Sequence, residues 1–293
     1  MGYLFLTIAL LCGSIKGFCG KKISGKVNTL KGVFYINTLR MLLCIAIGFF
    51  IVLLGGIGGF KVDLYTLFIT AMSGITTALF VATWIISVRK GAYLMIDIFL
   101  MLGSVLTIIL CNLFFKEAIT INQCIGFLLL LASTAIMCSY SSSIKGSFSL
   151  SSFLILAFCG LSNGLTDFSQ KCYVKTVEGG SIAVFNFYTY IFAALALLIF
   201  FMISHKFEKE ENDGKSFKVF LVVCIMSICL FSNSYFKTMA AKFLNSAVLY
   251  PVSNSAAIVL SAIMASVFFG EKMTKKSVLG IILTFMAIII MSL

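Results

Sequence analysis

Six ionisable side chains lie inside long apolar segments of the chain, where packing alone does not account for them. They are Lys16, Arg40, Asp97, Asp167, Lys171 and Lys237. An ionised side chain inside a membrane span is costly, so each one needs a partner charge or a water-filled cavity. With a helical rise of about 1.5 Å per residue, Arg40 and Asp97 lie roughly 10 Å from the same membrane face.

This counting predicts two charged clusters near opposite faces of the membrane. The first cluster contains Lys16, Arg40 and Asp97, and the second contains Asp167, Lys171 and Lys237. We expect them to act as alternating gates or as selectivity sites at the ends of a cavity. The alternative for the three lysines is that their long stems extend to the membrane interface. A carboxylate in either cluster is also a candidate site for a proton or a sodium ion, unless a paired cation keeps it ionised.

Neutral polar side chains in the same segments are the second set of candidates. Those expected to face a cavity are Trp84, Asn186, Tyr188, Asn233, Tyr235 and Asn254. Amides and hydroxyls can hydrogen-bond a small polar solute, and the indole of Trp84 can form an aromatic wall. The alternative is that these groups hydrogen-bond neighbouring helices, which is common in membrane bundles.

The elements that carry these residues must be membrane-spanning helices. Of the 293 residues, 61% are hydrophobic and 11% are charged, and the mean hydropathy is +1.12. Because a span needs about 20 apolar residues, the chain has room for about ten. The runs lack the alternating pattern of barrel strands, so we expect helices. They are predicted at 3–20, 33–54, 66–87, 91–114, 120–140, 152–173, 181–204, 218–241, 246–269 and 275–292.

The net charge of +12 does not indicate a nucleic-acid partner, because the basic residues lie in short connectors between apolar runs. We expect them to set the topology and to contact anionic lipids. The ten cysteines lie in or beside apolar segments without the spacing of a metal site, so they are expected to be small buried hydrophobes. No metal and no cofactor is predicted. The apolar segment 1–18 is expected to remain as the first span.

The chain contains an internal repeat. The segment 114–120, Phe-Phe-Lys-Glu-Ala-Ile-Thr, returns at 268–274 as Phe-Phe-Gly-Glu-Lys-Met-Thr. Five spans on each side of a serine-rich connector give the two halves opposite orientations, so we predict inverted repeats over residues 1–143 and 144–293. Repeated halves are typical of transporters, because a binding site can form between them.

Each copy of the repeat ends in a predicted helix start. Thr120 and Gln123 have the spacing of a capping box, which predicts that the fifth span begins there. Glu117 and Glu271 precede the helix starts, where a carboxylate meets the positive end of a helix dipole. We therefore expect a structural role for these glutamates and no role in transport.

These features resemble the drug/metabolite transporter superfamily, in particular its EamA-type ten-helix transporters. The resemblance rests on the segment 247–252, Ala-Val-Leu-Tyr-Pro-Val, and on the segment 268–274 followed by Gly280. It implies an all-α integral membrane fold of ten transmembrane helices in two inverted five-helix repeats. Spans one to four and six to nine would surround a central cavity, and spans five and ten would be peripheral.

The resemblance also adds candidate cavity residues. Tyr250 occupies a position similar to a cavity tyrosine of small multidrug-resistance relatives, and Pro251 is expected to kink span nine beside it. The candidate substrate contacts at this kink are Tyr250, Ser253 and Asn254.

One departure from the resemblance bears on function. Where the small multidrug-resistance relatives carry a membrane glutamate that binds protons and cationic drugs, this chain has Gly13 and, in the second copy, Asn163. This argues against proton-coupled export of cationic drugs, and it adds Asn163 to the candidate cavity residues. The excess of lysine and arginine over aspartate in the spans favours amino acids, other zwitterions and weak anions.

We therefore expect a secondary active or facilitative transporter of a small polar metabolite that works by alternating access and is not an enzyme. Its partners would be the small-molecule substrate, membrane lipids and, as coupling ions, protons or sodium, with no nucleic acid. The chain would be a monomer or a homodimer. The alternatives are a multidrug or organic-cation exporter, a membrane enzyme and a non-transporting scaffold.

The distribution of basic residues predicts the orientation in the plasma (inner) membrane. Lysines and arginines concentrate in one set of connectors, including 21–31 and 272–276, and few lie in the other set. The positive-inside rule makes the first set cytoplasmic, which places both termini outside the cytoplasm. Members of the family usually keep both termini in the cytoplasm, so this orientation departs from the resemblance.

Overall fold

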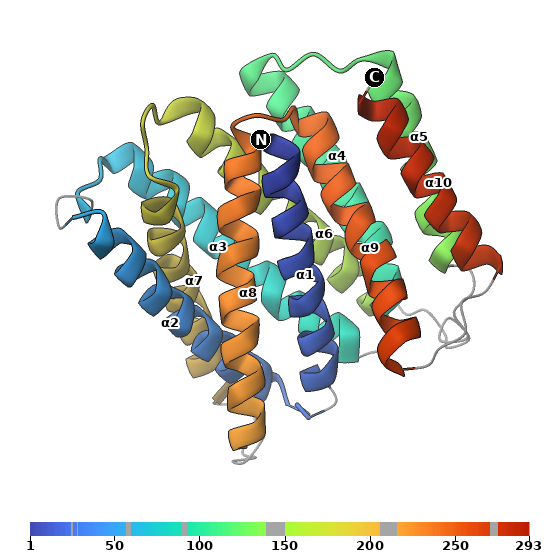
Figure 1. The fold of residues 1–293 in the computed structure, drawn as a ribbon. Coiled ribbons are helices and arrows are strands. Elements are labelled where there is room, and N and C mark those ends of the chain that lie inside the picture. Colours follow the sequence, from blue (N-terminus) through green and yellow to red (C-terminus); the bar gives the residue numbers. More distant parts are fainter. Residues whose placement is uncertain are drawn as a thin grey trace.

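Ten helices make up most of the chain that the computed structural model describes, which is residues 1–24, 26–27, 29–56, 60–89, 93–138, 150–205, 216–269 and 275–292 (Figure 1). In order they are α1 (Gly2–Ser24), α2 (Leu30–Leu54), α3 (Leu64–Arg89), α4 (Tyr93–Phe115), α5 (Ile121–Cys138), α6 (Leu150–Thr176), α7 (Ile182–His205), α8 (Phe217–Ala241), α9 (Ser246–Phe269) and α10 (Lys275–Ser292). Each helix overlaps one predicted span. The ends differ by a few residues, and α1, α2 and α6 are longer than predicted because helical hydrogen bonding continues beyond the apolar run.

The capping box predicted before the fifth span is present. The N–H of Thr120 donates to Oε1 of Gln123 at 3.1 Å, and the N–H of Gln123 donates to Oγ1 of Thr120 at 3.2 Å. These two bonds satisfy backbone and side-chain groups at the helix start. Helix α5 accordingly begins at the next residue, Ile121.

The surface of the bundle is apolar, as a lipid-facing surface must be. Among the described residues, six helical segments are long and apolar enough to cross a membrane, and three shorter apolar segments accompany them. Large side chains point outward, including Phe50, Phe68 and Leu128, which are 63%, 69% and 64% exposed. In water this surface would be unfavourable, whereas in a bilayer lipid covers it. The chain is therefore a multi-pass membrane protein.

The helices of the two halves pack against one another in matched pairs. Helix α1 packs on α8 and α3 packs on α6, so the first helix of each half meets the third helix of the other; α2 packs on α7, and α5 on α10. Helices α1 and α6 begin at opposite faces of the bundle, and both chain ends lie at the same face (Figure 1). This is the arrangement of two inverted five-helix repeats. The predicted boundary at residue 143 lies outside the described residues.

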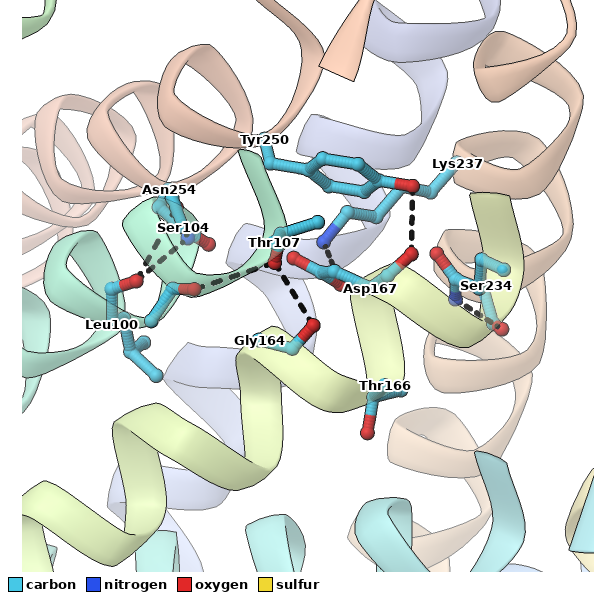
Figure 2. Close-up of polar contacts among 12 residues, drawn as sticks. Leu100, Ser104, Thr107, Gly164, Thr166, Asp167, Ser234, Lys237, Tyr250 and Asn254 are labelled. Atoms are coloured by element: carbon cyan, nitrogen blue, oxygen red, sulfur yellow. Dashed lines mark hydrogen bonds and ion pairs between the residues drawn. The ribbon is translucent and has the colours of Figure 1, made fainter. Parts of the chain in front are cut away.

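Helices α4 and α6 approach each other closely through glycines. A Cβ atom added at Gly103 would overlap the carbonyl oxygen of Gly160, and one added at Gly164 would overlap the carbonyl oxygen of Gly103. At the same crossing the hydroxyl of Thr107 donates to the carbonyl oxygen of Gly164 at 2.9 Å (Figure 2). Small residues allow such backbone contact in membranes, where packing and interhelical hydrogen bonds hold helices together.

We predict that Gly164→Ala destabilises the protein by about 1–3 kcal/mol, because the added methyl group must push α4 and α6 apart. The measurement is the thermal unfolding midpoint of purified protein in detergent. The matched control is Gly17→Ala on α1, where an added Cβ has no neighbour within 4 Å, and its midpoint should not fall. Equal midpoints for the two variants would contradict the close approach.

Candidate functional site

A cavity of about 150 Å³ lies between the two halves of the bundle. Its wall is formed by residues of α1, α2, α3, α4, α6, α7, α8 and α9. Helices α5 and α10 contribute none of the described wall residues and pack on each other instead. This is the arrangement that the resemblance implied for spans one to four and six to nine.

Four of the predicted charged residues line this one cavity: Lys16 on α1, Arg40 on α2, Asp167 on α6 and Lys237 on α8. The prediction of two clusters near opposite faces is therefore wrong for these residues. The counting failed because α1 and α6 extend beyond their apolar runs, which brings Lys16 and Asp167 closer to the middle of the bundle. The side chain of Asp97, on α4, lies outside the described residues, so its role stays a prediction.

Asp167 and Lys237 form a buried ion pair. Nζ of Lys237 lies 2.7 Å from Oδ1 of Asp167, and the two side chains are 9% and 2% exposed (Figure 2). Tyr250 covers this pair: its hydroxyl donates to the main-chain oxygen of Asp167 at 2.8 Å, and Nζ of Lys237 lies 5.3 Å from its ring centroid. A cation at this distance is attracted to the ring face. Lys237 is thus held inside the bundle and does not extend to the interface.

Arg40 and Lys16 leave the cavity with an excess of positive charge. Arg40 is 3% exposed, and its Nη1 donates to Oδ1 of Asn37 at 2.7 Å, while Nδ2 of Asn37 donates to the carbonyl oxygen of Val33. Neither Arg40 nor Lys16 pairs with a carboxylate among the described side chains. The described wall therefore holds three cationic side chains and one anionic side chain.

Five of the nine predicted neutral residues lie in the cavity wall: Trp84, Asn163, Asn233, Ser253 and Asn254. Two of their amides also join helices. Nδ2 of Asn254 donates to Ser104 Oγ at 2.7 Å (Figure 2), and Nδ2 of Asn233 donates to the carbonyl oxygen of Ala9 at 2.6 Å. For these two residues the alternative of hydrogen bonding to a neighbouring helix is confirmed, and a contact with substrate stays a prediction.

The other four predicted residues, Asn186, Tyr188, Tyr235 and Tyr250, are not part of the described wall. The ring of Tyr235 stacks on that of Phe231. Asn186 is fully buried and accepts a hydrogen bond from Ser234 Oγ at 2.6 Å. The hydroxyl of Tyr188 donates to the carbonyl oxygen of Phe60 at 2.7 Å. Tyr250 packs over the ion pair described above. Residue type alone did not show which side of a helix each of them occupies.

Sequence reasoning missed several polar residues of the wall. They are Ser14, Thr77, Thr166, Gln170, Tyr190 and Ser234. A usable signal was present on α6, where Asn163, Thr166, Asp167 and Gln170 recur at helical spacing. Residues three and four apart share one face of a helix, so these four form a single polar face.

Comparison with known proteins agrees with this arrangement. Residues 148–293 match the model of the EamA-like transporter family. The chain belongs to this family. It is therefore a member of the drug/metabolite transporter superfamily. No curated protein matches the sequence.

The fold of this EamA-like transporter also matches a solved crystal structure over its whole length. The match covers 99% of this chain and 95% of that chain, with a TM-score of 0.78 and 15% sequence identity. At this identity the likeness shows a shared fold. The family match covers the second half, and the structural match shows that the first half is part of the same fold.

In this EamA-like transporter, the glutamate of the first repeat joins three segments at one end of the bundle. Oε1 of Glu117 lies 2.9 Å from Nζ of Lys171, and Oε2 accepts the N–H of Ser246 at 3.0 Å. Lys171 also donates to the carbonyl oxygens of Ala241 and Leu244 at 3.1 and 2.7 Å. Lys171 is thus partnered outside the cavity wall.

This contact corrects the predicted role of Glu117. The carboxylate does meet the positive end of a helix, but the helix is α9, which begins at Ser246, and not α5. Glu271 lies outside the described residues. Burial alone would raise the pKa of Glu117, but the hydrogen bonds from Lys171 and Ser246 outweigh it and hold the pKa below its ordinary value.

We predict that Glu117→Gln lowers the stability by about 1–3 kcal/mol at neutral pH, because the buried ammonium of Lys171 loses its counter-charge. A carboxylate with a lowered pKa stabilises the fold above its ordinary pKa, and this contribution is lost as the pH falls through the folded-state pKa. The thermal midpoints of wild type and variant should therefore converge in acid. The control is Glu178→Gln in an exposed turn; a midpoint difference independent of pH would contradict the prediction.

Proposed function

We propose that this chain is a secondary transporter, active or facilitative, of a small polar metabolite that carries an anionic group. An amino acid, a similar zwitterion or a weak anion is the favoured substrate, moved across the plasma (inner) membrane by alternating access. The single observation that carries the proposal is the excess of cationic side chains around one cavity between the inverted halves. A cavity lined mainly by one sign of charge concentrates solutes of the opposite sign.

The size of the cavity supports a small solute. Its volume of about 150 Å³ is below the roughly 300–1,000 Å³ typical of pockets for drug-sized ligands. Gly13 and Asn163 both lie in the wall, so the two positions where a cation-binding glutamate would stand are neutral. Both observations favour a metabolite over the alternative of a multidrug or organic-cation exporter. The match to a transporter family supports a role as a carrier over a role as an enzyme.

The test is binding and counterflow with purified protein, using a panel of amino acids, carboxylic acids, amines, nucleobases and sugars. Trp84 is the only tryptophan of the chain and lies in the cavity wall, so a bound solute should change the intrinsic fluorescence. Trp84→Phe should remove this signal and leave counterflow in liposomes measurable. Saturable counterflow of an acid or amino acid is the expected result; counterflow of amines alone would overturn the proposal.

We predict that Arg40→Gln and Lys16→Gln each weaken the affinity for such a substrate by about 10- to 100-fold. A hydrogen bond to a buried charged group contributes about 1.5–3 kcal/mol, which corresponds to this factor. Lys61→Gln is the matched control, because Lys61 is exposed outside the cavity. The readouts are the dissociation constant from Trp84 fluorescence and the half-saturating concentration in counterflow. Unchanged affinity in both cavity variants would exclude these cations as substrate contacts.

We propose further that the lysine-rich face is cytoplasmic and that both termini lie on the other side. The basic residues of the connectors carry this proposal through the positive-inside rule. Reporters that are active on one side only, fused to Met1 and to Leu293, should both report the extracytoplasmic side. Cytoplasmic activity of both fusions would reverse the orientation, and opposite results would contradict the even number of spans.

A further inference from the structure

We infer that Asp167 and Gln170 form an acceptor subsite for the amino group of the substrate. The inference deepens the proposed function and rests on it, since it narrows the substrate from any small anion to one that carries a primary ammonium group. The cavity wall would then have two parts: cationic side chains that prefer an anionic group, and an acceptor subsite that prefers a cationic group.

The observation is a pair of buried oxygen atoms without a donor. Oδ2 of Asp167 and Oε1 of Gln170 have no hydrogen-bond partner, although the two residues are only 2% and 4% exposed. Both line the cavity, and they are three residues apart on α6, on the same face of the helix. Buried polar atoms are nearly always hydrogen-bonded, so two unpartnered acceptors on one helix face in the same cavity indicate a missing donor.

A chain of hydrogen bonds fixes which atom of Gln170 is free. The carbonyl oxygen of Ile182 can only accept, so it must face Nδ2 of Asn186, which lies 2.9 Å away. Oδ1 of Asn186 therefore accepts from the hydroxyl of Ser234 at 2.6 Å. Because Ser234 has one proton to donate, it accepts from Nε2 of Gln170 at 3.2 Å. The amide oxygen of Gln170 is thereby left free.

The carboxylate of Asp167 is held in a similar way. Oδ1 is occupied by Lys237 at 2.7 Å, and the hydroxyl of Tyr250 holds the main chain of the same residue (Figure 2). Oδ2 remains free while the side chain stays in place. Two fixed acceptors, one of them carrying negative charge, suit a group with several N–H donors and a positive charge.

A primary ammonium group has these properties, whereas a simple carboxylic acid or a sugar does not. The carboxylate of the same solute would then lie toward Arg40 and Lys16, which leave positive charge unpaired in the same wall. The combination selects an amino acid over the carboxylic acid of the same carbon skeleton. The competing explanation is that an ordered water molecule donates to both oxygens, and it is tested below.

The test measures binding by Trp84 fluorescence with matched probes: L-alanine, L-leucine and L-glutamate, each compared with its 2-hydroxy acid and with the acid that lacks the 2-substituent. Wild type should bind an amino acid at least about 10-fold more tightly than both analogues. Gln170→Met should reduce this preference by about 10-fold, mainly because amino-acid binding weakens. Asp167→Asn should reduce the preference as well and strengthen binding of the anionic analogues, because it also leaves Lys237 without its counter-charge. Gln123→Met, in the cap of α5, should leave the preference intact.

The outcomes separate this inference from the proposed function. If wild type binds amino acids and their analogues equally and Arg40→Gln weakens all of them, a small-anion transporter stands and the ammonium subsite falls, which leaves water as the donor. The thermal midpoint of Gln170→Met shows whether this variant is folded. If the folded variant keeps the preference for amino acids, the subsite lies elsewhere. If no probe binds saturably to wild type, both proposals fail.

Discussion

The close approach of α4 and α6 is the contact on which the polar interior depends. Gly103 and Gly164 let the two backbones touch, so one side of α6 packs against α4. The neighbouring side carries Asn163, Asp167 and Gln170 and must face the cavity. In hydrocarbon, polar groups have to be satisfied within the bundle or by water and solute in a cavity. Fixing α6 against α4 therefore also fixes where its charge and its amides are presented.

The charged residues of the cavity differ in what holds them. Asp167 and Lys237 are paired with each other, so each provides the other's counter-charge at 2.7 Å. Removing one partner of a buried pair leaves an uncompensated charge in the bundle, and this destabilises the fold far more than removing one partner of an exposed pair does. Arg40 is held by a neutral amide at 2.7 Å, and Lys16 pairs with no described carboxylate. The two members of the pair thus neutralise each other, and the two remaining cations determine the net charge of the wall.

The sequence predicted the helices well because lipid permits few alternatives: an apolar run of sufficient length must be helical, and the capping box marked the start of α5. The position of a side chain around its helix was not predictable in the same way. Distance along a span placed Lys16 and Asp167 too close to opposite faces, because α1 and α6 extend beyond their apolar runs. It also could not show that Asn186 lies outside the cavity wall. The partner of Glu117 was missed because Ser246 is 129 residues away in the sequence, and a local pattern carries no information about such a contact.

The two halves share a fold but contribute different chemistry to the cavity. The alignment that matches Gly13 with Asn163 is supported by identical pairs, which are Leu4 with Leu154, Leu6 with Leu156, Leu11 with Leu161, Phe18 with Phe168 and Lys21 with Lys171. In this alignment Gly17 corresponds to Asp167, and Gly20 corresponds to Gln170. A Cβ atom at Gly20 would lie 2.7 Å from the ring of Trp84, so this glycine makes room for the indole. The first half therefore presents an aromatic surface where the second half presents two acceptors, and a nearly symmetric scaffold can bind a solute whose two ends are chemically different.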